Sequence, residues 1–171
     1  MYYSFKHEFL INNSYTYQMT EEKLQQNHEI KKLRIVILGY NNFTTSIIQK
    51  FHEESSSVSI ICDLEKIPPV HKKNFLNQNN INLHQITNSL INDFSNVRIK
   101  ESDLFLAVTD SDLLNLMAIQ ISQNIFHIPK NKAMCIISNE DLAKIYINIG
   151  IKCINTSHVI TENISNELNR Q

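Results

Sequence analysis

The chain has 171 residues, of which 42% are hydrophobic and 19% charged, and its 16 basic and 17 acidic side chains give a formal net charge of -1. This length suits one domain with an appendage, and the even charge balance argues against nucleic-acid binding. The sequence has neither an apolar run of membrane-spanning length nor a His or Cys spacing typical of a metal site. We therefore expect no direct membrane insertion and no metal centre.

Residues 1–32 are polar, with scattered aromatic side chains and one helix start at Thr20, where Glu21 and Glu22 suit the first turn. We predict a partly helical N-terminal arm over residues 1–32, followed by one domain over residues 33–171. The arm is either an untethered tail or a docking segment for a partner.

From residue 33 onward, short apolar runs alternate with helical patterns. Strands are predicted at residues 33–38, 58–62, 81–86, 104–108, 133–137 and 152–154. Helices are predicted at residues 43–54, 88–97, 111–126, 140–148 and 157–168. Pro68 and Pro69 interrupt the second crossover, so it is weak and no helix is placed in it.

The strands are apolar at consecutive positions, which indicates burial on both faces. Alternation of such strands with helices predicts an α/β fold, a doubly wound parallel six-stranded sheet of the Rossmann-like type. The expected strand order is 3-2-1-4-5-6.

Three cysteines, Cys62, Cys135 and Cys153, fall on or beside predicted strands. Their odd number and the lack of a C-x-x-C pair argue against a disulfide framework and fit a reducing compartment. We interpret them as small buried hydrophobic residues.

The loop after the first predicted strand is the most specific feature of the sequence. Gly39 stands where a dinucleotide-binding loop makes its tight turn, but Asn41 and Thr44 replace the second and third glycines of G-x-G-x-x-G. We expect Asn41 to obstruct the approach of a pyrophosphate and Thr44 to crowd the helix against the strand. The loop therefore predicts the fold more strongly than it predicts phosphate binding.

Three further residues complete the candidate site. Asp63 follows the second predicted strand, where an acidic side chain can accept hydrogen bonds from a ribose, or can simply begin a turn. Thr109 and Asp110 follow the fourth predicted strand, beside the first, where ligands bind in such sheets. Helix capping by Asp110 or Ser111 is the structural alternative there.

Two segments carry a family resemblance. Residues 39–47 look like the G-x-G-R-F-G-x-S-I loop of RCK domains, also called KTN or TrkA-N domains, and residues 106–116 are similar to their A-V-T-x-x-D-x-x-N-L segment. The resemblance implies a nucleotide site at Gly39, Tyr40, Asn41, Asn42, Phe43, Asp63, Thr109 and Asp110, for NAD, NADH, ATP or ADP.

The departures from the family pattern weaken that site. Asn42 stands in place of the phosphate-binding Arg, and Ile86 and Thr87 stand in place of a Gly-Asp pair that contacts the nucleotide. We expect nucleotide binding to be weak or lost. The sequence ends after the last predicted helix, so we expect no counterpart of the family's C-terminal lobe.

The resemblance implies a cytoplasmic regulatory subunit, peripheral at the inner membrane face through a potassium channel or transporter subunit. Control would come from nucleotide-sensitive assembly of a homodimer or a higher ring. The helix at residues 111–126 carries more apolar side chains than one stripe can bury, which predicts an intermolecular contact unless the arm covers it.

Two alternatives remain. The chain could be a degenerate interaction module that dimerises without nucleotide. A nicotinamide oxidoreductase is less favoured, because Tyr146 lacks the Lys of a Tyr-x-x-x-Lys pair, Gly150 standing there instead. We therefore predict that the chain is not an enzyme.

Overall fold

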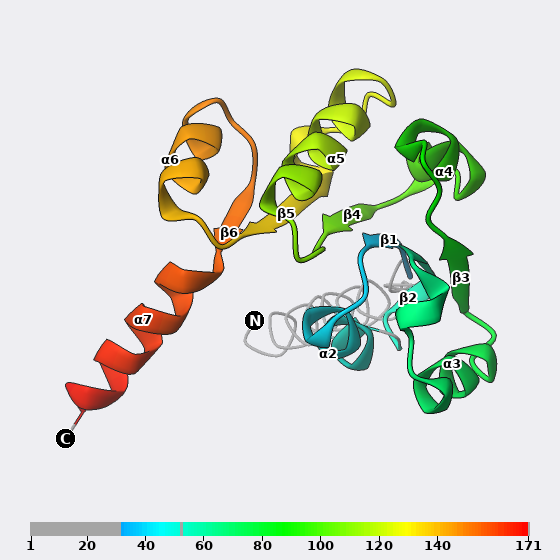
Figure 1. The fold of residues 1–171 in the computed structure, drawn as a ribbon, viewed down its shortest axis with the longest axis horizontal. Coiled ribbons are helices and arrows are strands. Elements are labelled where there is room, and N and C mark those ends of the chain that lie inside the picture. The colour runs from blue at the N-terminus through cyan, green and yellow to red at the C-terminus, as the bar shows by residue number, and fades with distance from the viewer. Residues whose placement is uncertain (1–31, 52, 171) are drawn as a thin grey trace, which may run out of the picture. The chain divides into compact units, whose positions relative to one another are not determined.

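The computed structural model describes residues 32–51 and 53–170, so the predicted arm lies outside the described residues except for Lys32. Strands and helices alternate along this part of the chain (Figure 1). The strands are β1 Leu33–Leu38, β2 Ser55–Cys62, β3 Ile81–Gln85, β4 Leu104–Ala107, β5 Ala133–Ile137 and β6 Cys153–Asn155. The α-helices are α2 Asn42–Phe51, α3 Pro69–Leu76, α4 Leu90–Asn96, α5 Asp112–Asn124, α6 Glu140–Asn148 and α7 Thr156–Leu168. Short 3-10 helices lie at Leu64–Lys66, Ile99–Glu101 and Lys130–Lys132.

The six strands form one parallel sheet in the order β3-β2-β1-β4-β5-β6, which confirms the predicted fold class and strand order. Strand β1 lies at the centre, where Ile35 pairs with Val58 of β2 and with Leu104 of β4. The order therefore reverses between β1 and β4, and the carboxyl ends of these two strands meet at the same edge of the sheet.

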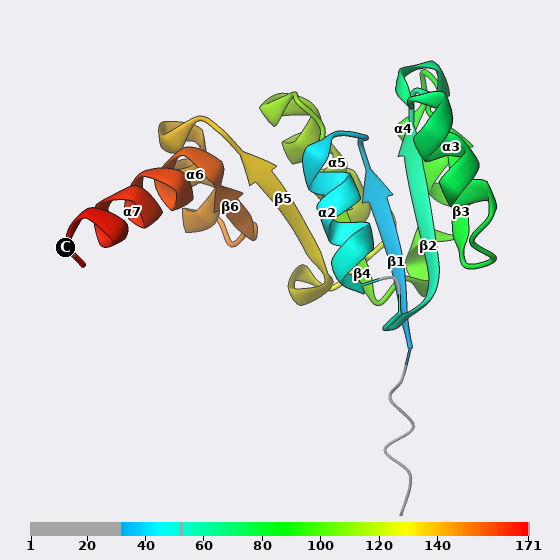
Figure 2. The ribbon, with the colours of Figure 1, turned by 90° about the horizontal axis from the view of Figure 1, so that it is seen from below.

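Helices cover both faces of the sheet (Figure 2). Val36 and Leu38 of β1 belong to a hydrophobic cluster with α4, α5 and α6, whereas Ile35 and Ile37 belong to a second cluster with α2 and α3. Alternate residues of one strand thus enter opposite clusters, which is why the strand is apolar at consecutive positions.

The second crossover contains a helix, so the prediction that placed none there was wrong. Helix α3 begins at Pro69, directly after Pro68. Proline fits the first turn of a helix because the amide hydrogen that it lacks has no partner within the helix there. The two prolines therefore start this helix, and its buried Phe75 packs into the second cluster.

Helix α7 differs from the other α-helices of the described part because it buries no residue. It begins next to β6 and extends away from the sheet (Figure 1). Its apolar side chains Val159, Ile160, Ile164 and Leu168 are exposed. In the part of the chain that the structure describes, no helix is long and apolar enough to cross a membrane.

Candidate functional site

A cleft of about 340 Å³ lies at the carboxyl ends of β1, β2 and β4, where the strand order reverses. It is lined by Gly39, Tyr40, Ile61, Cys62, Asp63, Lys66, Ile86, Thr109, Asp110, Ser111 and Leu114. Of the eight residues predicted for the site, Gly39, Tyr40, Asp63, Thr109 and Asp110 line this cleft. Sequence segments far apart in the chain therefore meet at one place in the sheet.

Gly39 allows the two central loops to approach each other closely. Its φ is +110°, a conformation that side chains disfavour. A Cβ atom built on Gly39 would lie 2.8 Å from the backbone nitrogen and 2.9 Å from the Cα atom of Thr109. The position thus requires glycine for its backbone conformation and for its contact with the β4–α5 loop.

Asn41 caps helix α2 with its own side chain. Its Oδ1 accepts hydrogen bonds from the backbone N–H groups of Phe43 at 3.0 Å and Thr44 at 3.3 Å. The first N–H groups of a helix have no partner within the helix and are the groups that a phosphate would accept from in this fold. In this chain, the amide oxygen of Asn41 already accepts from two of these groups.

The NH₂ group of the Asn41 side chain joins two loops. Its Nδ2 donates to the carbonyl oxygen of Val108 at 2.6 Å and to Oδ1 of Asp110 at 3.1 Å. The side chain therefore bridges the β1–α2 loop and the β4–α5 loop. Asn41 was expected only to obstruct a pyrophosphate, but it also holds the groups that would bind one.

Thr44 fits its position, contrary to the expectation that it would crowd the helix. Its side chain is fully buried, and its Oγ1 donates to the carbonyl oxygen of Gly39 at 3.0 Å. The same hydroxyl accepts a hydrogen bond from the backbone N–H of Asn41 at 3.2 Å. These bonds satisfy a buried polar group and fix the turn.

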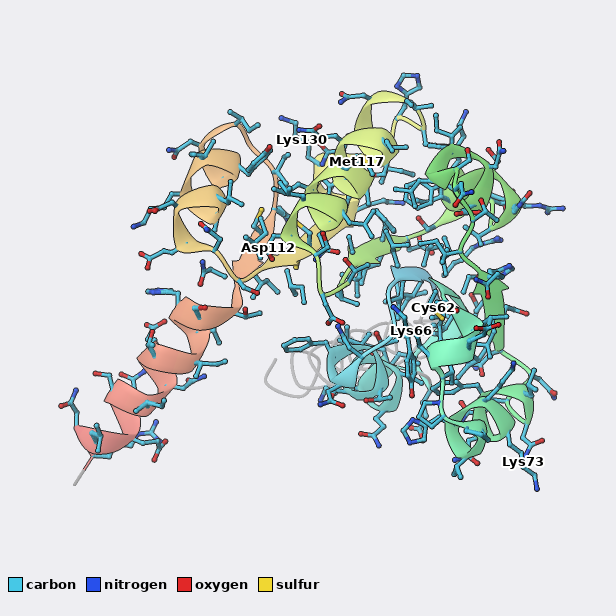
Figure 3. The ribbon with its side chains drawn as sticks, viewed as in Figure 1. Cys62, Lys66, Lys73, Asp112, Met117 and Lys130 are labelled. Carbon is cyan, nitrogen blue, oxygen red and sulfur yellow. The ribbon has the colours of Figure 1, made fainter. Side chains whose placement is uncertain are left out.

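Asp63 lies at the end of β2 and has a structural role beside its place in the cleft. Its Oδ1 accepts from the backbone N–H of Glu65 at 3.1 Å and caps a 3-10 helix. Carboxylate oxygens have further acceptor capacity, so this bond leaves room for a ribose hydroxyl. Lys66 is the basic residue of the cleft lining, and Figure 3 shows it beside Cys62.

Thr109 is held by a buried asparagine that sequence reasoning did not assign to the site. The backbone N–H and Oγ1 of Thr109 donate to Oδ1 of Asn115, at 2.9 Å and 2.7 Å. Nδ2 of Asn115 donates to the carbonyl oxygens of Thr109 at 2.9 Å and Ile136 at 3.1 Å. Asn115 is fully buried and does not line the cleft itself, but it holds Thr109, which does.

Ser111 is the residue that caps helix α5. Its side chain accepts from the backbone N–H of Leu114 at 3.3 Å. Asp110 is exposed and directs Oδ1 to Asn41. A phosphate brought to this loop would therefore meet a nearby carboxylate, which is unfavourable by charge.

Cys62 does not provide a reactive thiolate in the cleft. Burial raises the pKa of the Cys62 thiol to about 11, with a smaller contribution from the negative charge of Asp63. Burial, followed by the charge of Cys62, also raises the pKa of the neighbouring Tyr40 phenol. The Tyr40 hydroxyl forms a 2.5 Å hydrogen bond with Nδ1 of His71 on α3.

Asn42 and Phe43 do not line the cleft. Both are exposed on the first turn of α2. Thr87 is also engaged elsewhere, because its backbone N–H and Oγ1 donate to the carboxylate of Asp93. Of the positions that depart from the family pattern, Thr87 thus makes its contacts within the chain, whereas Asn42 is exposed and Ile86 lines the cleft.

Sequence reasoning missed the apolar wall of the cleft, formed by Ile61, Ile86 and Leu114. It also missed Lys66, which lines the cleft. The signal that could have indicated it is a basic residue three positions after Asp63, close to the expected nucleotide site. Among the residues described, no cluster of His, Cys, Asp or Glu could hold a metal ion.

The site can accommodate the sugar and base of a nucleotide better than its phosphates. The apolar wall and Asp63 fit a nucleoside, whereas Asn41 already holds the backbone donors that a pyrophosphate needs. A nucleotide that uses this loop must displace the Asn41 side chain.

Comparison with known proteins bears on the family and the fold of the chain. The family model described as the TrkA-N domain matches residues 35–161, while no curated protein matches the chain. The solved structure described as "Crystal Structure of the GsuK RCK domain" is similar, with a TM-score of 0.55 and 12% identity over 78% of this chain. The similarity spans 29% of that chain and shows the fold alone. Because the family match covers most of the sequence and the sheet order agrees with it, this chain belongs to the TrkA-N domain family.

Proposed function

We propose that this chain is a cytoplasmic regulatory subunit or domain of a potassium channel or transporter, controlled by assembly into a dimer or ring. TrkA-N domains are regulatory domains of potassium transport systems, and the family match supports this role here. The role is one of binding and assembly, and no catalytic step is assigned to the chain.

The observation that carries the proposal is the cleft between the β1–α2 and β4–α5 loops. Gly39, Asp63 and Thr109 lie there in the positions expected for a nucleotide site. A ligand in this cleft would contact two loops that Asn41 otherwise joins. Ligand binding would therefore change how the two halves of the sheet edge are connected.

Nucleotide affinity is expected to be low. A hydrogen bond to a charged group contributes about 1.5–3 kcal/mol, and about 1.4 kcal/mol corresponds to tenfold in affinity. Because Asn41 holds two of the donors, a nucleotide forfeits contacts worth about 3–6 kcal/mol, which corresponds to about a hundredfold to ten-thousandfold in affinity. A site that would bind at micromolar concentration thus shifts toward millimolar.

Exposed apolar side chains on α5, α6 and α7 support assembly with a second copy. They are Leu113 and Met117 on α5, Ile145 and Ile147 on α6, and Val159, Ile160, Ile164 and Leu168 on α7. Soluble monomers rarely expose so many apolar side chains on adjoining elements. A second copy of the chain would bury them on both partners at once.

Titration calorimetry with NAD, NADH, ATP and ADP tests the nucleotide part of the proposal. We expect dissociation constants near the millimolar range, with adenosine binding no more weakly than ADP because it does not need the occupied loop. Micromolar binding of any of the nucleotides would overturn the assignment of Asn41 as an internal substitute for phosphate.

A degenerate interaction module is the second candidate, and the hydrogen bonds of the Asn41 side chain to both loops favour it. Sedimentation with and without saturating nucleotide separates the two candidates. A nucleotide-dependent change in oligomeric state supports the regulator, whereas an unchanged oligomer together with no measurable binding supports the module.

The transport role is tested in the source organism. Affinity capture from solubilised membranes should recover a potassium channel or transporter subunit, and deletion of the gene should alter potassium uptake. Capture of the protein alone, together with normal uptake, would contradict the transport role.

A further inference from the structure

Two cysteines lie side by side on neighbouring strands at the far edge of the sheet. Cys135 of β5 and Cys153 of β6 are direct partners in the parallel register. Their sulfur atoms are 3.5 Å apart, and the Cys135 thiol donates to Sγ of Cys153. Both are free thiols. The pair lies outside the residues that line the nucleotide cleft.

The backbone spacing at this pair suits a disulfide. Adjacent strands lie about 4.7–4.9 Å apart, and the Cα atoms of disulfide-bonded cysteines are usually about 4.4–6.8 Å apart. Because Cys135 and Cys153 are register partners whose side chains lie on the same face of the sheet, small side-chain rotations bring the sulfur atoms into bonding distance. The strands themselves need not move.

The two thiols differ in access and in acidity. Cys135 is 1% exposed, whereas Cys153 is half-buried on the edge strand. The hydrogen bond from Cys135 lowers the pKa of the Cys153 thiol, and the same bond together with burial raises the pKa of Cys135. Cys153 is the more exposed and the more readily ionised of the two thiols, so it meets an oxidant first.

We propose that Cys135 and Cys153 are a redox modification site that forms an intramolecular disulfide when the protein meets a hydroperoxide. The Cys153 thiolate attacks one oxygen of hydrogen peroxide, the O–O bond breaks, and hydroxide leaves and takes up a proton as water. Cys153 is then a sulfenic acid. The Cys135 sulfur attacks the Cys153 sulfur, the S–O bond breaks, and the hydroxyl leaves as water with the Cys135 proton. Two thiols are oxidised and one peroxide is reduced to two waters.

The disulfide would restrain the N-terminal end of helix α7. Strand β6 has three residues, and Asn155 at its end caps α7 by accepting from the backbone N–H of His158 at 2.7 Å. A bond from Cys153 to β5 would close a covalent loop that contains α6 and would fix β6 to the sheet. Oxidation would therefore stiffen the connection between the sheet and the helix that extends from it.

Intact mass measurement on the unaltered chain tests the site. After treatment with hydrogen peroxide, the protein should lose two hydrogen atoms in mass, and a non-reduced digest should contain the peptides of Cys135 and Cys153 joined. A thiol reductant should restore the original mass. Amide hydrogen exchange over residues 152–155 should slow on oxidation and recover on reduction.

Cys62 provides the matched control. It is 4% exposed in the other hydrophobic cluster, so the Cys62→Ser variant should still form the disulfide. Cys153→Ser should abolish the mass loss and the change in hydrogen exchange. If that variant does not fold, differential alkylation of the peroxide-treated unaltered chain gives the same information, because Cys62 alone should then react after unfolding.

The proposal is overturned by any of three results. In the first, all three cysteines are alkylated after peroxide treatment and unfolding. In the second, the digest joins Cys62 to another cysteine or joins two chains. In the third, Cys153 is oxidised to a sulfinic acid while Cys135 stays a thiol.

Discussion

The Asn41 side chain occupies the N–H groups at the start of α2 that a phosphate would need for binding there. Its Oδ1 accepts from the first N–H groups of α2, and its Nδ2 reaches Val108 and Asp110 across the neighbouring loop. The sequence showed that a glycine was missing here, but not which groups the replacement would bind. Val108 is far away in the chain, so no local pattern could have indicated that bond.

The Asn41→Gly variant should bind ADP about a hundredfold to ten-thousandfold more tightly than the unaltered chain. Glycine is tolerated as a helix cap, and removing the side chain frees two N–H donors for a phosphate, each worth about 1.5–3 kcal/mol to a charged group. Titration calorimetry measures the change.

Asn139→Gly is the matched control for that experiment. Asn139 caps α6 by accepting from the backbone N–H of Leu142 at 2.9 Å, and it does not line the cleft. Its replacement should leave ADP affinity unchanged. Equal affinities in all three proteins would show that Asn41 does not compete with phosphate.

Gly39→Ala should lower the free energy of unfolding by about 2–3 kcal/mol, because the new Cβ is held at a strained φ against backbone atoms that cannot move aside. Gly150 is a useful comparison, since its φ is +87° but a Cβ there would meet the flexible end of Lys130 at 2.9 Å. Gly150→Ala should lower the free energy of unfolding by about 1 kcal/mol, because only the backbone conformation is strained there.

Urea denaturation followed by circular dichroism measures both variants. Equal losses of unfolding free energy in the two variants would show that the close contact between Gly39 and the Thr109 backbone does not add to the destabilisation.

At the scale of elements, two strand-to-helix turns use the same construction. After β3, Thr87 donates to Asp93, and after β4, Thr109 donates to Asn115, in each case through the backbone N–H and the hydroxyl. A serine two residues after each threonine caps the helix. The shared T-x-S-x-x-x-D/N spacing can be read in the sequence, although its purpose needs the structure.

Asn115→Ala should destabilise the chain by about 2–3 kcal/mol. Asn115 is fully buried and joins α5 to the ends of β4 and β5, so its loss leaves buried backbone and hydroxyl groups without partners. Asn124→Ala is the control on the same helix, because Asn124 is exposed. That change should stay within about 0.5 kcal/mol, and a comparable loss in both variants would contradict the assignment.

Periodicity predicted the strands and most helices, because each carries a regular apolar pattern, which all of them except α7 bury at least in part. It failed at α3, where Pro68 and Pro69 resemble an interruption although proline also starts helices. The contact between Cys135 and Cys153 was equally hidden, since it depends on the register of β5 against β6. Local patterns fix the type of element, whereas pairing between distant segments fixes which side chains meet.

At the scale of the whole molecule, alternation of strands and helices predicted a doubly wound parallel sheet, and the likeness of the first loop to a dinucleotide-binding loop indicated the strand order. The exposed faces of α5, α6 and α7 remain a prediction about assembly. Single-sequence reasoning identified the surplus of apolar residues on α5, but the structure adds that α7 buries none of its residues.

The double variant Ile160→Asp and Ile164→Asp should convert a dimer into a monomer. Both side chains are exposed on α7, at 57% and 56%, and two new charges would have to be desolvated in a shared apolar interface. Analytical ultracentrifugation measures the oligomeric state.

Val70→Asp and Leu76→Asp on α3 form the control pair, because these side chains are still more exposed, at 68% and 67%. That variant should remain dimeric. A monomeric unaltered chain in dilute solution would remove the basis of the dimer prediction.

The position of the Asn41 amide has a consequence for selectivity. A group attached to the loop itself acts as a tethered competitor, whose effective concentration does not fall when the protein is diluted. Every ligand that places a phosphate at the N-terminus of α2 must displace the Asn41 side chain and loses binding free energy in doing so. An uncharged ligand in the cleft does not have to displace it. If the cleft binds a nucleotide as proposed, the chain would therefore discriminate among ligands by the shape of base and sugar, and small phosphorylated compounds would compete poorly for it.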